Sequence, residues 1–168
     1  MTIRNLCVSL LLAVTSISTA DARQAPATAD ERALTALVER WTAARSANDA
    51  EAMRPLFAEK VDRVNMATGL VESTTRDELI SYFAKGFIGS AKGTHAKTLK
   101  ARPLLLSADA GLVDHTYTMY NADGSEVGVG HTTFVALKNG TSWQVVAVRY
   151  VSAWPAGPAA SAKATPPR

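Results

Sequence analysis

Three side chains in the C-terminal half of the chain are of types that small active sites use: His115, Tyr117 and Arg149. The imidazole of His115 can act as a general acid or base near neutral pH. Tyr117 can donate a hydrogen bond, and the guanidinium of Arg149 can clamp a carboxylate or an enolate. Two structural alternatives stay open: His115 can be a core histidine bonded to a neighbour, and Arg149 can be exposed or paired with an acid. The acids considered for this pairing are Asp114, Glu39 and Glu51.

The histidines give no metal-binding pattern. His95, His115 and His131 lack ligand spacing, and strand alternation places His115 and His131 on opposite faces of a sheet. The glycines of residues 124–130 lie inside an expected strand, so they do not form a phosphate-binding loop. No serine carries the flanking glycines of a nucleophile elbow. We therefore predict no metal and no cofactor.

Three helices are expected before the closing strands. Capping boxes, in which a threonine is followed three residues later by a glutamate, begin the first and the third helix. The second helix is shorter and contains Pro55, which should kink it. Apolar residues at helical spacing give the first helix, residues 29–46, a stripe that can be buried. The capping pairs are Thr28 with Glu31 and Thr75 with Glu78, and the stripe contains Leu34, Leu37, Val38, Trp41 and Ala44.

The rest of the chain alternates in the manner of β-strands. Two short strands lie between the second and third helices, and four longer strands follow the third helix. Asp123-Gly124 and Asn139-Gly140 mark tight hairpins between the last three strands. The predicted order is therefore ααββαββββ, an α+β fold with helices on one face of a curved antiparallel sheet. The strands are expected at residues 61–66, 70–73, 94–107, 112–121, 126–138 and 142–153.

The two hairpin turns determine which side chains share a face of the sheet. Two-residue turns would place His115 opposite Thr132, and Thr132 opposite Ala147. We expect the face with the larger apolar side chains to be concave, since its glycines permit curvature. A slip of one residue at either turn would exchange the faces. The expected concave face comprises Val113, His115, Tyr117, Met119, Gly128, Gly130, Thr132, Phe134, Trp143, Val145, Ala147, Arg149 and Val151.

Residues 1–22 have the layout of a cleavable secretory signal. Arg4 supplies a positive charge, residues 6–17 are apolar, and small residues end the segment, with cleavage expected after either Ala22 or Ala20. The apolar run is shorter than the ~20 residues that span a bilayer. We therefore expect a periplasmic or secreted protein whose mature chain has no membrane span. The only cysteine lies within this signal, so the mature protein would contain no disulfide.

The composition indicates one small globular domain, which we place at residues 28–154. The chain of 168 residues is 47% hydrophobic and 20% charged, as in folded rather than disordered proteins. Residues 155–168 are rich in Ala and Pro and are expected to form a flexible tail. The net charge is +3, but the Lys and Arg residues are scattered, so we expect no nucleic-acid partner.

Short motifs at the joints of these elements follow one another in a characteristic order. They are Val38-Glu39-Arg40-Trp41, Asn48-Asp49, Leu56-Phe57-Ala58-Glu59, Thr75, Asn139-Gly140, Trp143, Arg149, Tyr150 and Ser152. This ordered set resembles the nuclear transport factor 2-like superfamily, in its SnoaL-like group, over about residues 29–154. The resemblance implies a cone-shaped roll with a pocket between the concave sheet and the helices, and often a homodimer. It implies no single reaction, because this fold carries unrelated activities.

Ketosteroid isomerase is the member whose chemistry can be compared directly, since the resemblance runs without gaps over the first two helices and the first strand. That enzyme uses a helix tyrosine, a neutral aspartic acid on the sheet and an aspartate base. The matching positions here are Trp41, Thr132 and Asn65. An asparagine cannot move a proton near pH 7, so the isomerase constellation is absent.

Two functions remain open at this stage. The first is a non-catalytic domain that binds a small, largely apolar or amphipathic ligand or acts through a dimer surface. The second is a small enzyme of the lyase, isomerase or hydrolase type, with His115 as acid or base and with Tyr117, Asn65 and Arg149 orienting a polar substrate head. In either case the residues expected to contact the ligand are Trp41, Asn65, Phe83, Tyr117, Thr132 and Phe134. Aromatic residues such as these can also be plain core.

Overall fold

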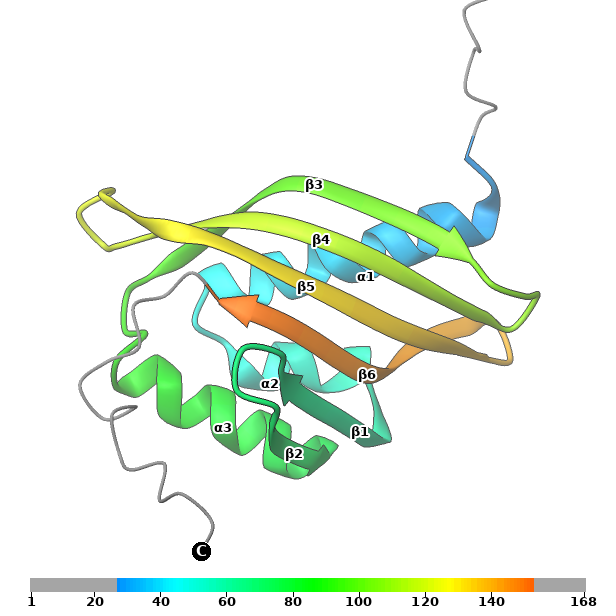
Figure 1. Ribbon diagram of the computed structural model, residues 1–168, viewed down its shortest axis with the longest axis horizontal. Helices are drawn as coiled ribbons and strands as arrows, with labels where there is room; N and C mark the ends of the chain where they lie inside the picture. Colours follow the sequence, from blue (N-terminus) through cyan, green and yellow to red (C-terminus); the bar gives the residue numbers. More distant parts are fainter. Residues whose placement is uncertain (1–26, 153–168) are drawn as a thin grey trace, which may run out of the picture.

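The structure, a computed structural model, describes residues 27–152 (Figure 1). The signal expected at residues 1–22 and the tail expected at residues 155–168 lie outside this range. Within it, helices and strands follow one another in the predicted order, with one turn of 3-10 helix added after the second helix.

Helix α1 (Ala29–Ser46) begins at the predicted capping box. The Thr28 hydroxyl accepts a hydrogen bond from the backbone N–H of Glu31, and the Glu31 carboxylate accepts one from the backbone N–H of Thr28 at 2.7 Å. The apolar stripe predicted for this helix is buried. The same stripe also buries Arg45, which the apolar pattern did not select.

The second helix is short because Pro55 interrupts it. Helix α2 (Ala50–Met53) passes into the 3-10 turn η1 (Arg54–Leu56), and Pro55 lies in the first positions of that turn. Helix α3 (Arg76–Ile88) begins at the second predicted capping box, where Thr75 and Glu78 exchange hydrogen bonds with each other's backbone.

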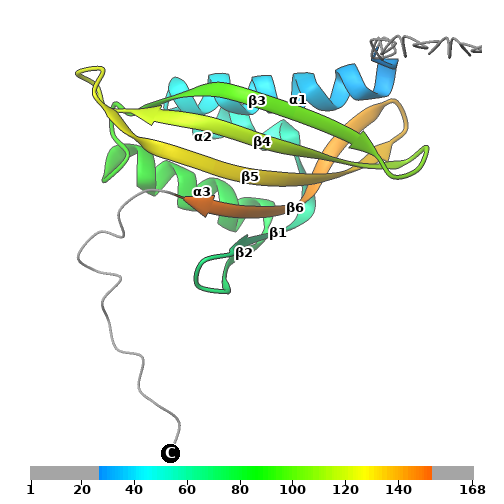
Figure 2. The same cartoon turned by 45° about the horizontal axis from the view of Figure 1, so that its top comes forward.

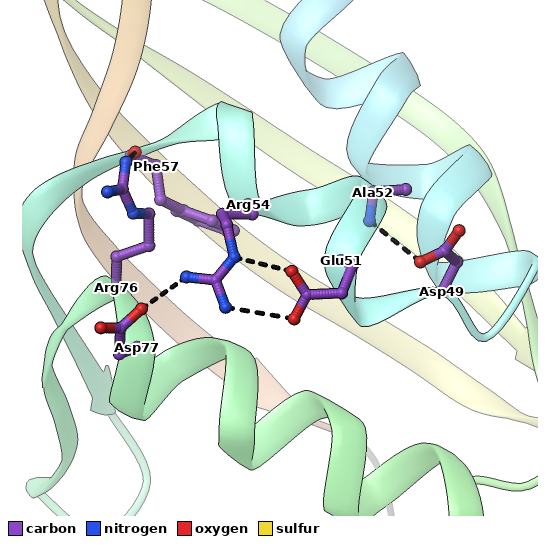
Figure 3. Close-up of polar contacts among 7 residues, drawn as sticks. All are labelled: Asp49, Glu51, Ala52, Arg54, Phe57, Arg76 and Asp77. Carbon is purple, nitrogen blue, oxygen red and sulfur yellow. Dashed lines mark hydrogen bonds and ion pairs between the residues drawn. The ribbon is translucent and has the colours of Figure 1, made fainter.

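An arginine at the start of η1 ties this segment to α3. The guanidinium of Arg54 donates two hydrogen bonds to Glu51 and one to Asp77 (Figure 3). Glu51 belongs to α2 and Asp77 to the first turn of α3, so the ion pairs fix the approach of the two helices. All three side chains are partly or well exposed, so we assign the pairs a small contribution to stability.

Six strands form one curved sheet in the order β2-β1-β6-β5-β4-β3. All neighbouring pairs are antiparallel except β1 with β6, which run parallel. The sequence predicted an antiparallel sheet throughout, and this pair corrects it. Helix α3 separates the first hairpin from the closing strands along the chain, and β6 runs alongside β1 in the same direction. The strands are β1 (Phe57–Asn65), β2 (Leu70–Thr75), β3 (His95–Leu105), β4 (Ala110–Tyr120), β5 (Glu126–Asn139) and β6 (Ser142–Ser152).

The helices lie on one face of this sheet (Figures 1 and 2). Helix α1 packs mainly on β3, and α3 packs on β1 and β2. The two helices therefore cover opposite edges of the sheet and leave its middle strands between them. The hydrophobic core fills the space under α1, where Leu34, Val38 and Phe134 are almost completely buried. The other face of the sheet carries no helix in the described residues.

The register confirms one predicted pairing and corrects the other. His115 lies opposite Thr132, as predicted. At the next hairpin Asn139 pairs with Ser142, and one extra residue, Val146, then bulges from β6. Thr132 consequently lies opposite Tyr150 rather than Ala147.

The bulge exchanges the faces of β6 beyond Val146. Val148 and Tyr150 point to the helix side and are buried, whereas Val151 is exposed on the outer face. Arg149, which the sequence placed on the concave face, is therefore on the outer face. A bulge of one residue reverses the alternation, and this is the physical reason for the correction.

Candidate functional site

A cavity of about 710 Å³ lies between α1 and α3, above the middle strands of the sheet. Its size is within the range of small-molecule sites, about 300–1,000 Å³. Aromatic and aliphatic side chains form most of its wall, and a few charged groups interrupt them. The apolar lining residues are Trp41, Phe57, Phe83, Phe87, Tyr117, Met119, Val127, Phe134 and Val148, among others.

The floor of the cavity is built around Trp41 of α1. Its ring meets the rings of Tyr117 and Phe134 edge-on, with centroids 5.5 and 5.4 Å apart. Tyr117 lies across β5 directly over Gly130, where a Cβ atom would come within 2.4 Å of the ring. A glycine is therefore required at this position for the ring to lie flat on the sheet.

His115 is buried in the core beneath this floor. Only 1% of its surface is exposed, and its ring stacks on Tyr117 with centroids 5.0 Å apart. Its Nε2 is hydrogen-bonded to the Thr98 hydroxyl at 3.0 Å. Burial lowers the pKa of His115 to about 4, so the imidazole is neutral at pH 7. His115 does not line the large cavity.

A polar cluster forms one wall of the cavity, where β1, β2 and β6 meet. Arg63 is buried and forms an ion pair with Glu72. Its guanidinium also lies over the rings of Tyr150, at 3.9 Å, and Tyr82, at 4.3 Å. The hydroxyl of Tyr150 donates a hydrogen bond to the second carboxylate oxygen of Glu72. The positive charge of Arg63 is thus matched by a carboxylate and by aromatic faces.

Burial raises the pKa of the Tyr150 hydroxyl, and the charge of Arg63 opposes that rise in part. Burial likewise raises the pKa of Tyr117. Both phenols are therefore protonated near neutral pH and act as hydrogen-bond donors within the cavity.

Arg45 lies at another part of the cavity wall, near the C-terminal ends of α1 and α3. It is 8% exposed, and its Nη2 donates a hydrogen bond to the Thr94 hydroxyl at 3.0 Å. Its guanidinium carbon is 4.9 Å from the centre of the Phe87 ring. Burial lowers the pKa of Arg45, which nevertheless stays protonated. Within residues 27–152, its Nη1 has no hydrogen-bond partner.

The structure brings together the six residues that were expected to contact a ligand. All of them line the cavity: Trp41, Asn65, Phe83, Tyr117, Thr132 and Phe134. The two residues expected to be catalytic are not part of this lining. Arg149 instead pairs with Asp62 at 2.7 Å, and both Arg149 and His115 border a shallower hollow of about 350 Å³.

The charged residues of the cavity were not predicted. Arg45 had a signal in the sequence, because it follows Trp41 by four residues and thus continues the apolar stripe of the helix. Tyr150 was assigned to the other face because the bulge in β6 has no signature in the alternation. Arg63 and Glu72 meet only through the pairing of β1 with β2.

Groups of three metal-ligating side chains and membrane-crossing helices are both absent from the described residues. Within residues 27–152, no three metal-ligating side chains come close enough to share an ion. None of the helices there has the length and apolar character required to cross a lipid bilayer.

Comparison with known proteins identifies the fold. No protein-family model and no curated protein matches the chain. A protein of unknown function with a cystatin-like fold from Nostoc punctiforme superimposes with a TM-score of 0.66 and 17% identity, over 76% of this chain and 96% of that one. An NTF2-like protein with a cystatin-like fold from Novosphingobium aromaticivorans gives a TM-score of 0.61 and 15% identity, over 78% and 86% of the two chains.

A candidate scytalone dehydratase from the same organism is also similar, with a TM-score of 0.60 and 15% identity over 72% of this chain and 82% of that one. At such identities the likeness concerns the fold alone. The fold expected from the sequence is confirmed: the chain has the cystatin-like fold of the nuclear transport factor 2-like proteins.

Proposed function

We propose that this domain binds a small, largely apolar ligand in the cavity between α1 and α3 and does not catalyse a reaction. The observation that carries this proposal is the wall of aromatic and aliphatic side chains around about 710 Å³ of space. Burial of apolar ligand surface against such a wall contributes about 25 cal/mol per Å² before the costs of association.

The position of His115 supports a binding role over catalysis. Its ring lies behind Tyr117 and Trp41, and it does not line the cavity. A general acid or base must come within hydrogen-bond reach of the reacting atoms and should titrate near the working pH. The ring of His115 is buried, so it does not come within reach of a ligand in the cavity. Its pKa of about 4 is also well below neutral pH.

A neutral fluorescent dye such as Nile red tests the binding role. Val148 lines the cavity and Val151 lies on the outer face of the same strand, so their phenylalanine variants form a matched pair. We expect Val148→Phe to weaken dye binding about tenfold and Val151→Phe to leave it unchanged. Equal affinity in all three proteins would place the dye elsewhere and contradict the proposal.

An activity screen tests the enzymatic alternative. Small carbonyl compounds and hydrolysable esters would be incubated with the wild-type protein and with His115→Ala. We expect no turnover by either protein. An activity that falls by about two orders of magnitude in His115→Ala would instead support the lyase, isomerase or hydrolase role.

We also propose that the domain forms a homodimer through the outer face of its sheet. Four apolar side chains lie in register across neighbouring strands there: Leu104, Leu112, Val135 and Ala147. An apolar row of this kind favours burial against a second sheet. Sedimentation analysis of the wild type and of Leu104→Lys would test this, with a dimer expected only for the wild type. A monomeric wild type would contradict it.

Export is proposed from the sequence pattern of residues 1–22 alone. Expression of the full chain in a bacterial host, followed by mass measurement of the secreted or periplasmic product, would test it. A product that begins at residue 21 or 23 is expected. Retention of the whole chain inside the cell would contradict it.

A further inference from the structure

Arg45 is a buried charge in the cavity wall that the binding of an apolar molecule leaves unexplained. Its side chain is buried, and it reaches the cavity beside Phe87. Among the described residues, no carboxylate lies within ion-pair distance of it. Its Nη1 also has no hydrogen-bond partner there.

The single hydrogen bond of Arg45 does not balance its charge. Thr94 accepts it through a neutral hydroxyl, which in turn donates to the backbone carbonyl of Ala91 at 2.8 Å. A buried charge without a counter-ion costs free energy that a folded protein rarely leaves unrecovered. An anion placed beside the Arg45 guanidinium would recover that cost and form a charge-assisted hydrogen bond.

The charge of the cavity as a whole favours an anion. Arg45, Arg63 and Lys85 line it, and Glu72 is its only acidic lining residue in the described range. Glu72 is occupied by Arg63 and by the Tyr150 hydroxyl, so it cannot neutralise the other cations. The positive excess therefore lies on the side of Arg45 and Lys85.

From this we infer that the ligand is an amphipathic organic acid whose carboxylate binds Arg45 while its apolar body lies against Trp41 and Phe83. The inference rests on the proposed binding function and specifies its ligand class. The same arrangement would select an acid over the corresponding alcohol, because only the acid supplies a counter-charge.

Matched acid and alcohol probes test the assignment. Decanoate and decanol differ mainly in the head group, and the naphthoate and naphthylmethanol pair offers the same comparison with a rigid aromatic body. Isothermal titration calorimetry at pH 7.5 would measure their affinities for the wild type. We expect each acid to bind at least about tenfold more tightly than its alcohol.

Three variants assign the preference to one side chain. Arg45→Met replaces the apolar stem of the side chain with one of similar shape, removes the guanidinium charge, and should reduce the acid preference to within about twofold, with alcohol binding retained. Arg45→Lys should keep part of the preference. Arg149→Met removes one positive charge from the outer face and should leave the preference unchanged, which controls for net charge.

The outcomes separate this inference from the proposed function. Equal binding of acid and alcohol by the wild type, or an acid preference that survives in Arg45→Met, would overturn the inference and leave the binding function in place. Failure of every probe to bind would overturn both. If Arg45→Met does not fold, a rise in wild-type melting temperature with decanoate but not with decanol, reduced in Arg45→Lys, supports the inference, and equal rises overturn it.

Discussion

The cavity has two buried arginines in opposite electrostatic surroundings. Arg63 and Arg45 are equally exposed, at 8% each. Arg63 is paired with Glu72 and enclosed by tyrosine rings, whereas Arg45 has one bond to a neutral hydroxyl and one aromatic neighbour. Within the described residues, the charge of Arg63 is balanced by a carboxylate and the charge of Arg45 is not. A buried cation that is paired within its own chain stabilises the fold, whereas an unpaired one is available to bind a ligand.

The largest loss of stability is expected when the ion pair of Arg63 with Glu72 is removed. Glu72→Leu leaves Arg63 buried without its carboxylate and removes the acceptor of the Tyr150 hydroxyl. We expect the free energy of unfolding to fall by about 3 kcal/mol in denaturant titrations. Asp62→Leu breaks a half-exposed pair with Arg149 and serves as the control, with a loss of less than about 1 kcal/mol. Equal losses would show that Arg63 does not depend on its partner.

A change of pH tests a further buried polar group, His115, which lies beneath the aromatic rings of the cavity floor. Its pKa in the folded state is about 4, below the ordinary value of 6.5, so the unfolded chain binds the proton more readily between these values. The contribution of the neutral imidazole to the stability of the fold is therefore fully present above pH 6.5 and is lost as the pH falls toward 4. We expect stability to decrease by about 1 kcal/mol per pH unit in this window.

Denaturant titrations of His115→Gln at several pH values would isolate this contribution. The variant lacks the titrating group, so its stability should fall less steeply between pH 6.5 and 4. Identical slopes for the variant and the wild type would contradict the burial of a neutral imidazole.

The floor between the two walls depends on Gly130. Gly130→Ala places a methyl group against the Tyr117 ring and should cost about 2 kcal/mol of stability, as overpacking does. Gly86→Ala is the matched control, because no atom lies within 4 Å of the added Cβ and the residue is within α3. That control should be neutral or slightly stabilising. Thermal unfolding of both variants would show whether the ring lies as described, and a tolerated Gly130→Ala would contradict it.

The smallest change in stability is expected when the unpaired Arg45 is replaced. Arg45→Met removes a buried charge that has no counter-ion, so the free energy of unfolding should change by less than about 1 kcal/mol or should rise. A change this small, compared with the loss of about 3 kcal/mol expected for Glu72→Leu, would show that the two arginines differ in their contribution to stability. A loss of about 3 kcal/mol in Arg45→Met would mean that Arg45 stabilises the fold as Arg63 does.

Local signals in the sequence were sufficient for the helices. The threonine–glutamate pairs fix the starts of α1 and α3, and the apolar stripe fixes the buried face of α1, because both depend on residues within one or two turns. The pairing of His115 with Thr132 was also predicted, but the turn differs from the two-residue turn that was assumed. Tyr120 pairs with Glu126, and a shift of one residue at Val127 then restores the predicted register.

Features that depend on distant parts of the chain were not predictable. The bulge at Val146 lies in a valine-rich strand that gives no local sign of it, and it moves Arg149 to the outer face and Tyr150 into the cavity. The parallel pairing of β1 with β6 joins strands separated by most of the domain. The ion pair of Arg63 with Glu72 depends on tertiary register, so no spacing rule could have found it.

A crystal structure of the protein grown with saturating decanoate would show directly whether Arg45 binds the carboxylate of a ligand. We predict electron density for the acid in the cavity, with its carboxylate within hydrogen-bond distance of the Arg45 guanidinium and its hydrocarbon chain between α1 and α3. Two results would contradict this role of Arg45. In the first, the cavity of the saturated protein holds no decanoate, and in the second, the carboxylate of the bound acid points away from Arg45.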